Sequence, residues 1–394
     1  MKFATRLLTF DPAPGDRYTP ANTPIYQTAT FRQEDATEFG EYDYCRSGNP
    51  TRAVVEKHIA ALESGTRGFC FATGLAAIAA VTRLVAPGEE IVACDDLYGG
   101  TYRLFSRILA RRGITVRYAD FRDLTAVAAA INHNTRLVYL ETPTNPLLQV
   151  IDIRAIAEIA HRRGALVCVD NSTMSPYLQR PLELGADIVL HSATKFLCGH
   201  SDVMAGAVVV KDGELGEELY LIQNGEGAVL SPFDSYLLLR GIRTLSLRLD
   251  RQQSNAKAVA AFLREQPAVT EVYFPGFAEE ERLRIHDSQA SGHGAVLSFV
   301  TGDAELSRNV VEATRLFAIT VSFGGVNPTI SLPNYMSHAS IPESVRHLKS
   351  IPRDLVRMSV GAEDVDDLLE DLGQAFEFAT RRSQSASLSE VAAD

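Results

Sequence analysis

The chain has 394 residues, 46% of them hydrophobic, and a formal net charge of −11 at pH 7. The length allows two or three domains, and the acidic balance argues against a nucleic-acid-binding surface, which needs a basic face. No apolar run approaches membrane-spanning length and the N-terminus lacks the apolar core of a signal peptide, so we expect no membrane contact and a cytoplasmic location.

The chain has five cysteines and no CxxC pair. An odd number without close pairs does not form a disulfide framework. Cys70, Cys94 and Cys168 lie in apolar, strand-like runs, which is typical of packed thiols in a reducing compartment. We expect no metal ion.

Residues 1–47 are rich in Pro, Thr and Tyr and show little periodicity, so we expect an extended arm that packs on another surface. Residues 48–247 then alternate strand and helix patterns. Strands are expected at 67–72, 91–94, 114–118, 137–140, 166–169, 187–190 and 207–210, and helices at 74–85, 102–111 and 153–162. This alternation predicts an α/β domain whose mostly parallel sheet is covered by helices on both faces.

A long helical pattern begins after about residue 231 and leads into a second, smaller α/β region at 248–382. Strands are expected there at 296–300 and 356–360. Residues 383–394 are small and polar, which predicts a disordered tail.

The segment HSATKFLCGHSDVMAG follows the apolar run at 187–190 and contains Lys195. Burial disfavours the ammonium form, so a lysine at the end of a buried strand becomes a neutral nucleophile. Its usual use is a Schiff base with a carbonyl or with pyridoxal 5′-phosphate (PLP). The alternative is a strand-end lysine that reaches solvent.

Ligands in open α/β sheets lie at the carboxyl ends of strands, where several polar residues of this chain are expected. Thr73, Gly74 and Leu75 form a strand-to-helix turn whose unpaired N–H groups suit a phosphate. Asp170, in VDNST, suits a protonated pyridine nitrogen. The alternatives are an ordinary threonine cap and a capping aspartate.

Two further strand ends carry Asn145, in ETPTNP, and Tyr98, in DDLYGG. The amide suits a ring hydroxyl, and the phenol suits stacking on a heteroaromatic ring or acid–base work. A proline-framed turn and simple packing are the alternatives.

Tyr44 and Arg46 occupy alternate positions of the arm, where both can reach one oxyanion. Arg357 lies within an apolar strand, and a buried arginine needs an anionic partner. A substrate carboxylate is one candidate, and a distant Asp or Glu is the other. For Arg46 the alternative is a solvated side chain.

The motifs YDYCRSGNPTR, ETPTNP, VDNST and HSATKFLCGHSDVMAG occur in this order, and with them the chain resembles the Cys/Met-metabolism family of PLP enzymes. The match runs from about residue 18 to 378. It implies the PLP-dependent aspartate-aminotransferase-like fold (fold type I), with a seven-stranded large-domain sheet. It also implies a homotetramer of two active dimers, with active sites at the dimer interface.

Carried over by position, the resemblance implies that Lys195 bonds to the cofactor and shuttles protons, Asp170 pairs with the pyridine nitrogen and Tyr98 stacks on the ring. The implied contacts to the cofactor phosphate are Gly74, Leu75, Ser192 and Thr194 of one subunit and Tyr44 and Arg46 of its neighbour. The implied substrate contacts are Asn145, Ser322 and Arg357, with supporting roles for Glu141 and Thr173.

The implied activity is a C–S lyase that cleaves L-cystathionine and related sulfur amino acids by α,β- or α,γ-elimination. The products are a keto acid, ammonia and a thiol, with Tyr98 or Tyr44 protonating the leaving sulfur. Gly100 stands where methionine γ-lyases typically have cysteine, and Asn327 stands where many γ-acting members have glutamate.

Methionine γ-lyase and cystathionine γ-synthase-type replacement on an O-acylhomoserine stay open as alternatives. A PLP-fold protein without lyase activity is a third. The joint presence of Lys195, Asp170 and Arg357 argues against it.

Overall fold

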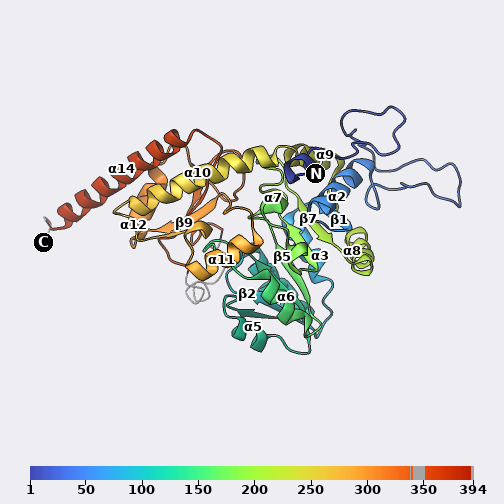
Figure 1. The fold of residues 1–394 in the computed structure, drawn as a ribbon, viewed down its shortest axis with the longest axis horizontal. Coiled ribbons are helices and arrows are strands. Elements are labelled where there is room, and N and C mark those ends of the chain that lie inside the picture. The colour runs from blue at the N-terminus through green and yellow to red at the C-terminus, as the bar shows by residue number, and fades with distance from the viewer. Residues whose placement is uncertain (338, 340–350, 392–394) are drawn as a thin grey trace.

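The computed structural model describes residues 1–337, 339 and 351–391. Two sheets organise the chain, one of seven strands and one of five. Figure 1 shows the second sheet and its helices at one end of the molecule and the first sheet at the other, with helix α10 (Leu245–Glu265) extending along both.

The first sheet has the strand order β1-β7-β6-β5-β4-β2-β3. Only β7 runs antiparallel to its neighbours, while the other pairings are parallel. This confirms the expected mostly parallel seven-stranded sheet. The strands are β1 (Arg67–Phe71), β2 (Glu90–Cys94), β3 (Thr115–Ala119), β4 (Thr135–Glu141), β5 (Leu166–Asp170), β6 (Ile188–His191) and β7 (Gly206–Val210).

Most helices of this region, though not α4 and α7, begin at side chains that cap the free backbone N–H groups. Asn49, Thr73, Asp152, Asp212 and Ser231 each accept a hydrogen bond from the first turn of their helix. Such caps make the helix starts readable from sequence. The helices are α2 (Pro50–Leu62), α3 (Gly74–Thr82), α4 (Gly99–Arg103), α5 (Leu124–Ala130), α6 (Ile153–His161), α7 (Ser175–Leu178), α8 (Gly213–Glu226) and α9 (Pro232–Ile242).

The helix expected at 102–111 is broken in the structure. The α-helix ends at Arg103, a wider π-type turn follows at Leu104–Ile108, and a 3-10 turn follows at Leu109–Arg112. Leu104 and Leu109 are both buried, and their spacing of five residues fits a π-turn better than an α-helix.

The second sheet has the order β10-β11-β12-β9-β8 and is mostly antiparallel. Both strands expected from the sequence are present, as β9 and β12. The elements are β8 (Glu271–Tyr273), α11 (Glu280–Gln289), β9 (Val296–Val300), α12 (Ala304–Ala313), β10 (Ala318–Ile319), β11 (Thr329–Ser331), β12 (Val356–Ser359) and α14 (Val365–Val391).

Two features differ from the segmentation expected from the sequence. Helix α10 crosses residues 247–248, where we expect the domain boundary, because its buried face contacts both regions. Helix α14 continues to Val391, although a disordered tail is expected from residue 383. Residues 383–391 contain no Gly or Pro that would stop a helix. The last three residues of that tail, 392–394, lie outside the described residues.

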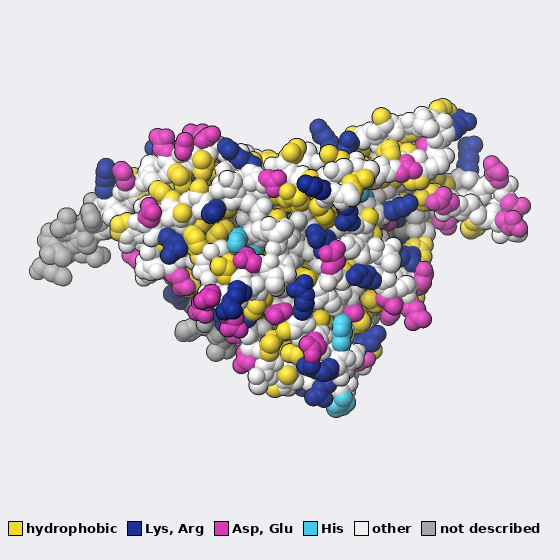
Figure 2. All heavy atoms as spheres, viewed as in Figure 1, with side chains coloured by type: hydrophobic (Ala, Val, Ile, Leu, Met, Phe, Trp, Pro, Cys, Tyr) yellow, Lys and Arg dark blue, Asp and Glu magenta, His cyan; other side chains and the backbone are white. Residues whose placement is uncertain are grey.

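The N-terminal arm has one short helix, α1 (Phe3–Arg6), and then an isolated bridge between Thr30 and Tyr44. In Figure 1 its loops project from the body beside α2. Among the described residues, no helix is long and apolar enough to span a membrane. Acidic and basic side chains are interspersed over the face shown in Figure 2.

Candidate active site

A cavity of about 530 Å³ lies where the carboxyl ends of β4, β5 and β6 meet the start of α3. Residues 321–323 and Arg357 of the second sheet region line its other side. Of the residues singled out from the sequence, the cavity brings together Thr73, Gly74, Leu75, Tyr98, Glu141, Asn145, Asp170, Thr173, Ser192, Thr194, Lys195, Ser322 and Arg357.

Lys195 follows β6 and reaches across the cavity. Its Nζ donates to Ser322 Oγ at 2.5 Å and lies 4.9 Å from the centre of the Phe323 ring. Burial, and to a smaller extent the Arg357 guanidinium, lower the pKa of Lys195 to about 8, while Asp170 opposes the shift. A large fraction of the amine is therefore neutral near pH 8, as a nucleophile or base requires.

Asp170 ends β5 and is held by three donor groups from two residues. Ser172 donates to its Oδ1 through the backbone N–H at 3.0 Å and the hydroxyl at 2.5 Å, and the Tyr139 hydroxyl donates to Oδ2 at 3.2 Å. Burial raises the pKa of Asp170, while the Ser172 hydrogen bonds lower it. A cationic ring nitrogen beside this carboxyl would favour its ionised form.

The start of α3 packs closely on the end of β6. The Thr73 hydroxyl caps the helix by accepting from the backbone N–H of Ala76 at 2.9 Å. A Cβ at Gly74 would meet the Cβ of Ser192 at 2.8 Å, so only glycine allows this approach. Thr194 is held in place by Ala205, whose backbone N–H donates to the threonine Oγ1 at 2.9 Å. The result is a cradle of helix N–H groups and hydroxyls that suits a phosphate.

Arg357 is 3% exposed and lies on β12. Its Nη1 donates to Asn145 Oδ1 at 3.0 Å and its Nη2 to the Ser322 carbonyl at 2.7 Å. Within the described ranges no carboxylate lies at ion-pair distance from this guanidinium, which leaves an incoming carboxylate as its natural partner. Burial lowers the pKa of Arg357 to about 10.

Ser322 has a φ of +81°, in the left-handed region that serine rarely adopts. Its carbonyl is held by Arg357 and its hydroxyl by Lys195. Unfavourable backbone conformations persist where surrounding contacts fix them, and they cluster at functional sites.

Tyr98 lies at the cavity entrance and is 40% exposed. Its backbone N–H donates to Glu141 Oε1 at 2.9 Å, which ties the start of α4 to the end of β4. Its ring lies over Gly100, where a Cβ would overlap it. The stacking role expected for this ring stays a prediction.

Tyr44 and Arg46 do not line this cavity. Tyr44 is 42% exposed, and the Arg46 guanidinium lies 5.2 Å from the centre of its ring. Arg46 Nε donates to Asn224 Oδ1 at 3.2 Å. Within one chain the arm therefore contributes nothing to the site around Lys195.

Several residues that support the site were not singled out from the sequence. Ser172 is the easiest of them to recognise from the sequence, because it stands two positions after Asp170 and carries a hydroxyl. It also accepts from the Ser192 backbone N–H at 2.6 Å. Tyr139 carries no such signal, since it lies in an ordinary apolar strand. Phe323 stands between Ser322 and Gly324, where an apolar ring gives no sign of a contact with Lys195.

A buried pair supports the same edge of the sheet. His191 Nε2 and Glu63 Oε1 lie 2.6 Å apart, both fully buried, and Asn171 Nδ2 donates to the same oxygen at 3.0 Å. The two partners are 128 residues apart in sequence, so no local pattern indicates their contact.

A phosphorylated pyridine carrying an aldehyde fits these groups. The glycine-lined cradle at α3 accepts the phosphate, the buried Asp170 carboxyl suits the ring nitrogen, and the Lys195 amine suits the aldehyde. PLP is such a molecule.

The family model described as "Cys/Met metabolism PLP-dependent enzyme" matches residues 4–377. The chloroplastic cystathionine beta-lyase of Arabidopsis thaliana is 54% identical over 92% of this chain and 78% of its own length. The cystathionine gamma-lyase of Bacillus subtilis is 47% identical over 92% of this chain and 96% of its own.

The crystal structure of cystathionine gamma-lyase from Lactobacillus plantarum, complexed with L-serine, superposes with a TM-score of 0.93. It is 43% identical and covers 96% of this chain and 100% of its own. This likeness confirms the expected fold type I architecture. From its fold, its cavity and these matches, the chain belongs to the Cys/Met-metabolism family of PLP-dependent enzymes.

Proposed function

We propose that the protein is a PLP-dependent carbon–sulfur lyase that cleaves L-cystathionine, with β-elimination as its main reaction. The observation that carries the proposal is the joint placement of Lys195, Asp170 and Arg357 in one cavity. The 54% identity to a protein named cystathionine beta-lyase supports the substrate.

The cofactor is held, in this proposal, by Lys195, by Asp170 and by the cradle of Thr73, Gly74, Leu75, Ser192 and Thr194, with Thr173 beside Asp170. When bound, PLP supplies an electron-poor ring that delocalises the charge left at Cα. Ser172 and Tyr139 keep Asp170 oriented toward the ring nitrogen.

Arg357 binds the substrate α-carboxylate in a bidentate manner, and Asn145 fixes the guanidinium at Nη1. Lys195, neutral once free, removes the Cα proton, and Ser322 Oγ directs its amine. The sulfur then leaves Cβ as a thiolate and takes a proton from the Tyr98 hydroxyl. Water completes the reaction, so that cystathionine yields homocysteine, pyruvate and ammonia.

γ-Elimination is the second candidate, because the 47% and 43% identical relatives are named cystathionine gamma-lyases. It would release cysteine, 2-oxobutyrate and ammonia. Asn327 stands where many γ-acting members of the family have glutamate, and this departure supports β-elimination. Its Nδ2 donates to Glu363 Oε1 at 3.1 Å.

The test is to supply the PLP-loaded protein with L-cystathionine and to identify the keto acid, with the Lys195→Ala variant as the control. Pyruvate is the expected product, and 2-oxobutyrate would move the assignment to γ-elimination. If a fully PLP-loaded protein forms no keto acid, the proposal is overturned.

We also propose that Tyr44 and Arg46 complete the phosphate site of a neighbouring copy in a homotetramer. The projecting arm and its absence from the cavity of its own chain support this arrangement. Mixing the inactive variants Arg46→Ala and Lys195→Ala should restore activity in mixed oligomers. If oligomers proven to contain both variants recover no activity, the arrangement is contradicted.

We place the protein in the cytoplasm, because its five cysteines are free thiols and four of them are buried. Fractionation of cells that express the tagged protein tests this location.

A further inference from the structure

A row of buried polar side chains lies along helix α10. Arg248, Gln252 and Asn255 are 6%, 0% and 1% exposed. Spacings of four and three residues put all three on one face of the helix. Burying polar side chains has a cost unless each donor finds an acceptor. Here the acceptors are mainly backbone carbonyls, and among the described residues Arg248 Nη1 finds none.

Arg248 binds the turn that follows Lys195. Its Nη2 donates to the carbonyls of Phe196 at 2.8 Å and Leu197 at 3.4 Å, and to that of Gly241 at 2.9 Å. A Cβ at Gly199, whose φ is +74°, would overlap the guanidinium. The arginine therefore fills a space shaped by the backbone of the Lys195 turn.

Arg248 is also a buried cation without a carboxylate partner among the described residues. Burial lowers its pKa to about 10. An apolar residue of similar length would avoid that desolvation. Its hydrogen bonds instead join the backbone after the reactive lysine, at Phe196 and Leu197, to Gly241 of α9 and Thr244 at the start of α10.

Gln252, one turn further along α10, binds the opposite wall of the cavity. Its Nε2 donates to the Gly325 carbonyl at 2.7 Å and the Val360 carbonyl at 3.1 Å. Gly325 follows Ser322 by three residues in the loop that carries the acceptor of the Lys195 amine.

The two segments also touch each other directly. The Val326 backbone N–H donates to the Gly199 carbonyl at 3.0 Å. A Cβ at Gly324, whose φ is +83°, would meet Phe196 N at 2.7 Å. Residues 195–199 and 322–326 thus form two packed turns, and α10 binds one through Arg248 and the other through Gln252.

We propose that Arg248 and Gln252 are positioning residues, which together set Lys195 against Ser322 by fixing both turns to one rigid helix. The proposal rests on the catalytic role proposed for Lys195. Because a misplacement of about 1 Å costs on the order of a hundredfold in rate, two such anchors act on catalysis without touching substrate.

The test uses Arg248→Lys and Gln252→Leu in the PLP-loaded protein. Lysine keeps the charge but loses the planar fork of donors, and leucine keeps the volume but loses both hydrogen bonds. We expect kcat to fall about tenfold to a hundredfold, with KM changed by less than about threefold. The pH at which the visible absorbance of bound PLP changes should shift in both variants, because Lys195 has moved.

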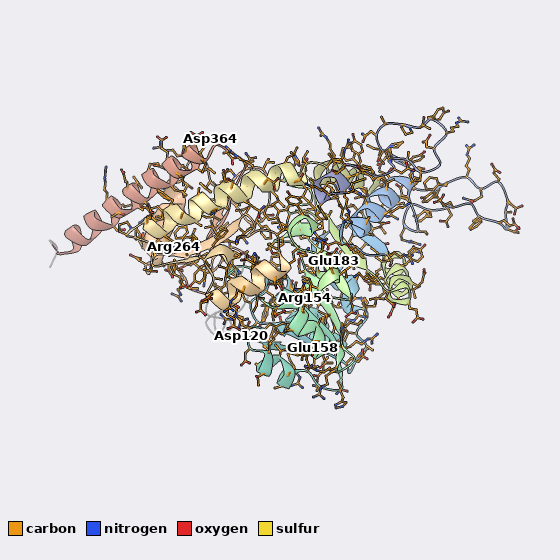
Figure 3. All side chains as sticks on the ribbon, viewed as in Figure 1. Asp120, Arg154, Glu158, Glu183, Arg264 and Asp364 are labelled. Atoms are coloured by element: carbon orange, nitrogen blue, oxygen red, sulfur yellow. The ribbon has the colours of Figure 1, made fainter. Side chains whose placement is uncertain are left out.

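Asn255→Leu is the matched control for a lost buried donor. Asn255 Nδ2 donates to the carbonyls of Gly361 and Glu363 and contacts neither turn. This variant should unfold at a lower temperature yet keep the wild-type kcat and absorbance titration. Arg264→Lys, at the far end of α10 in Figure 3, is the control for the arginine exchange on an exposed side chain.

Wild-type kcat and an unshifted titration in Gln252→Leu and in any folded Arg248→Lys would overturn the proposal. The same holds if Asn255→Leu loses as much kcat as Gln252→Leu, since the effect would then be general destabilisation. Should Arg248→Lys fail to fold, Gln252→Leu alone decides. A failure of the proposed function is distinct, because it would show as a PLP-loaded wild-type protein that forms no keto acid from cystathionine, or as an active Lys195→Ala protein.

Discussion

The two walls of the cavity are held in different ways. On the wall from the first sheet, Asp170 is bound by Ser172 two residues later and by Tyr139 of the same sheet. On the wall from the second sheet, Arg357 reaches Asn145 across 212 residues and Ser322 across 35. Apart from Lys195, whose amine reaches Ser322 across 127 residues, the proposed cofactor contacts are thus held within the first sheet region, whereas the proposed substrate contacts depend on how the two sheets dock.

Among substitutions on the wall from the first sheet, Lys195→Ala should lower activity the most. Loss of the base and of the cofactor attachment should lower keto acid production by about 10⁴-fold or more. The free energy of unfolding of the PLP-free protein should fall little, since the buried amine contributes one hydrogen bond, to Ser322. A variant that turns over at the wild-type rate would remove Lys195 from the mechanism.

On the wall from the second sheet, Arg357→Leu should weaken substrate binding. The variant loses a charge-assisted bidentate contact, which corresponds to about 2–5 kcal/mol, so kcat/KM for cystathionine should fall at least about thirtyfold. PLP content should stay at the wild-type level, because Arg357 belongs to the proposed substrate side. If PLP is lost and KM is unchanged, the division into two walls is wrong.

The pH dependence of PLP capture tests the role of Lys195 on the wall from the first sheet. The pKa of Lys195 is lowered to about 8 from 10.5, so the amine is protonated below that pH and neutral above it. The rate at which the PLP-free protein captures PLP should therefore rise through pH 8 and level off near pH 9. Stopped-flow absorbance measures this rate. A rate still climbing steeply at pH 10 would indicate an ordinary, solvated lysine.

The smallest effect is expected at the helix start on the first wall. Thr73→Ala removes the acceptor for the Ala76 N–H, which should cost about 1 kcal/mol of the free energy of unfolding in urea. Thr73→Ser keeps the hydroxyl and should be close to wild type. Equal stability of all three proteins would show that the cap contributes nothing.

The same contrast explains how far sequence reasoning reaches. Asp170, Lys195 and the turn at Thr73 stand at strand ends and helix starts, where apolar runs stop and a polar residue follows, so their meeting is predictable from sheet geometry. The seven-stranded sheet follows from the same alternation.

Contacts that depend on tertiary packing cannot be predicted from such local patterns. Glu63 and His191 meet only because α2 packs against the sheet, and Arg248 looks like any arginine on a helix. The π-turn after α4 and the continuation of α14 depend on burial and on the absence of a stop signal, neither of which has a strong local pattern.

The most direct test of the central claim is to reduce the PLP-loaded protein with borohydride, digest it and find the labelled residue by mass spectrometry. Lys195 should carry the reduced cofactor, and no other lysine should be labelled. A label on a different lysine, or none on a protein that shows the visible absorbance of bound PLP, would contradict it.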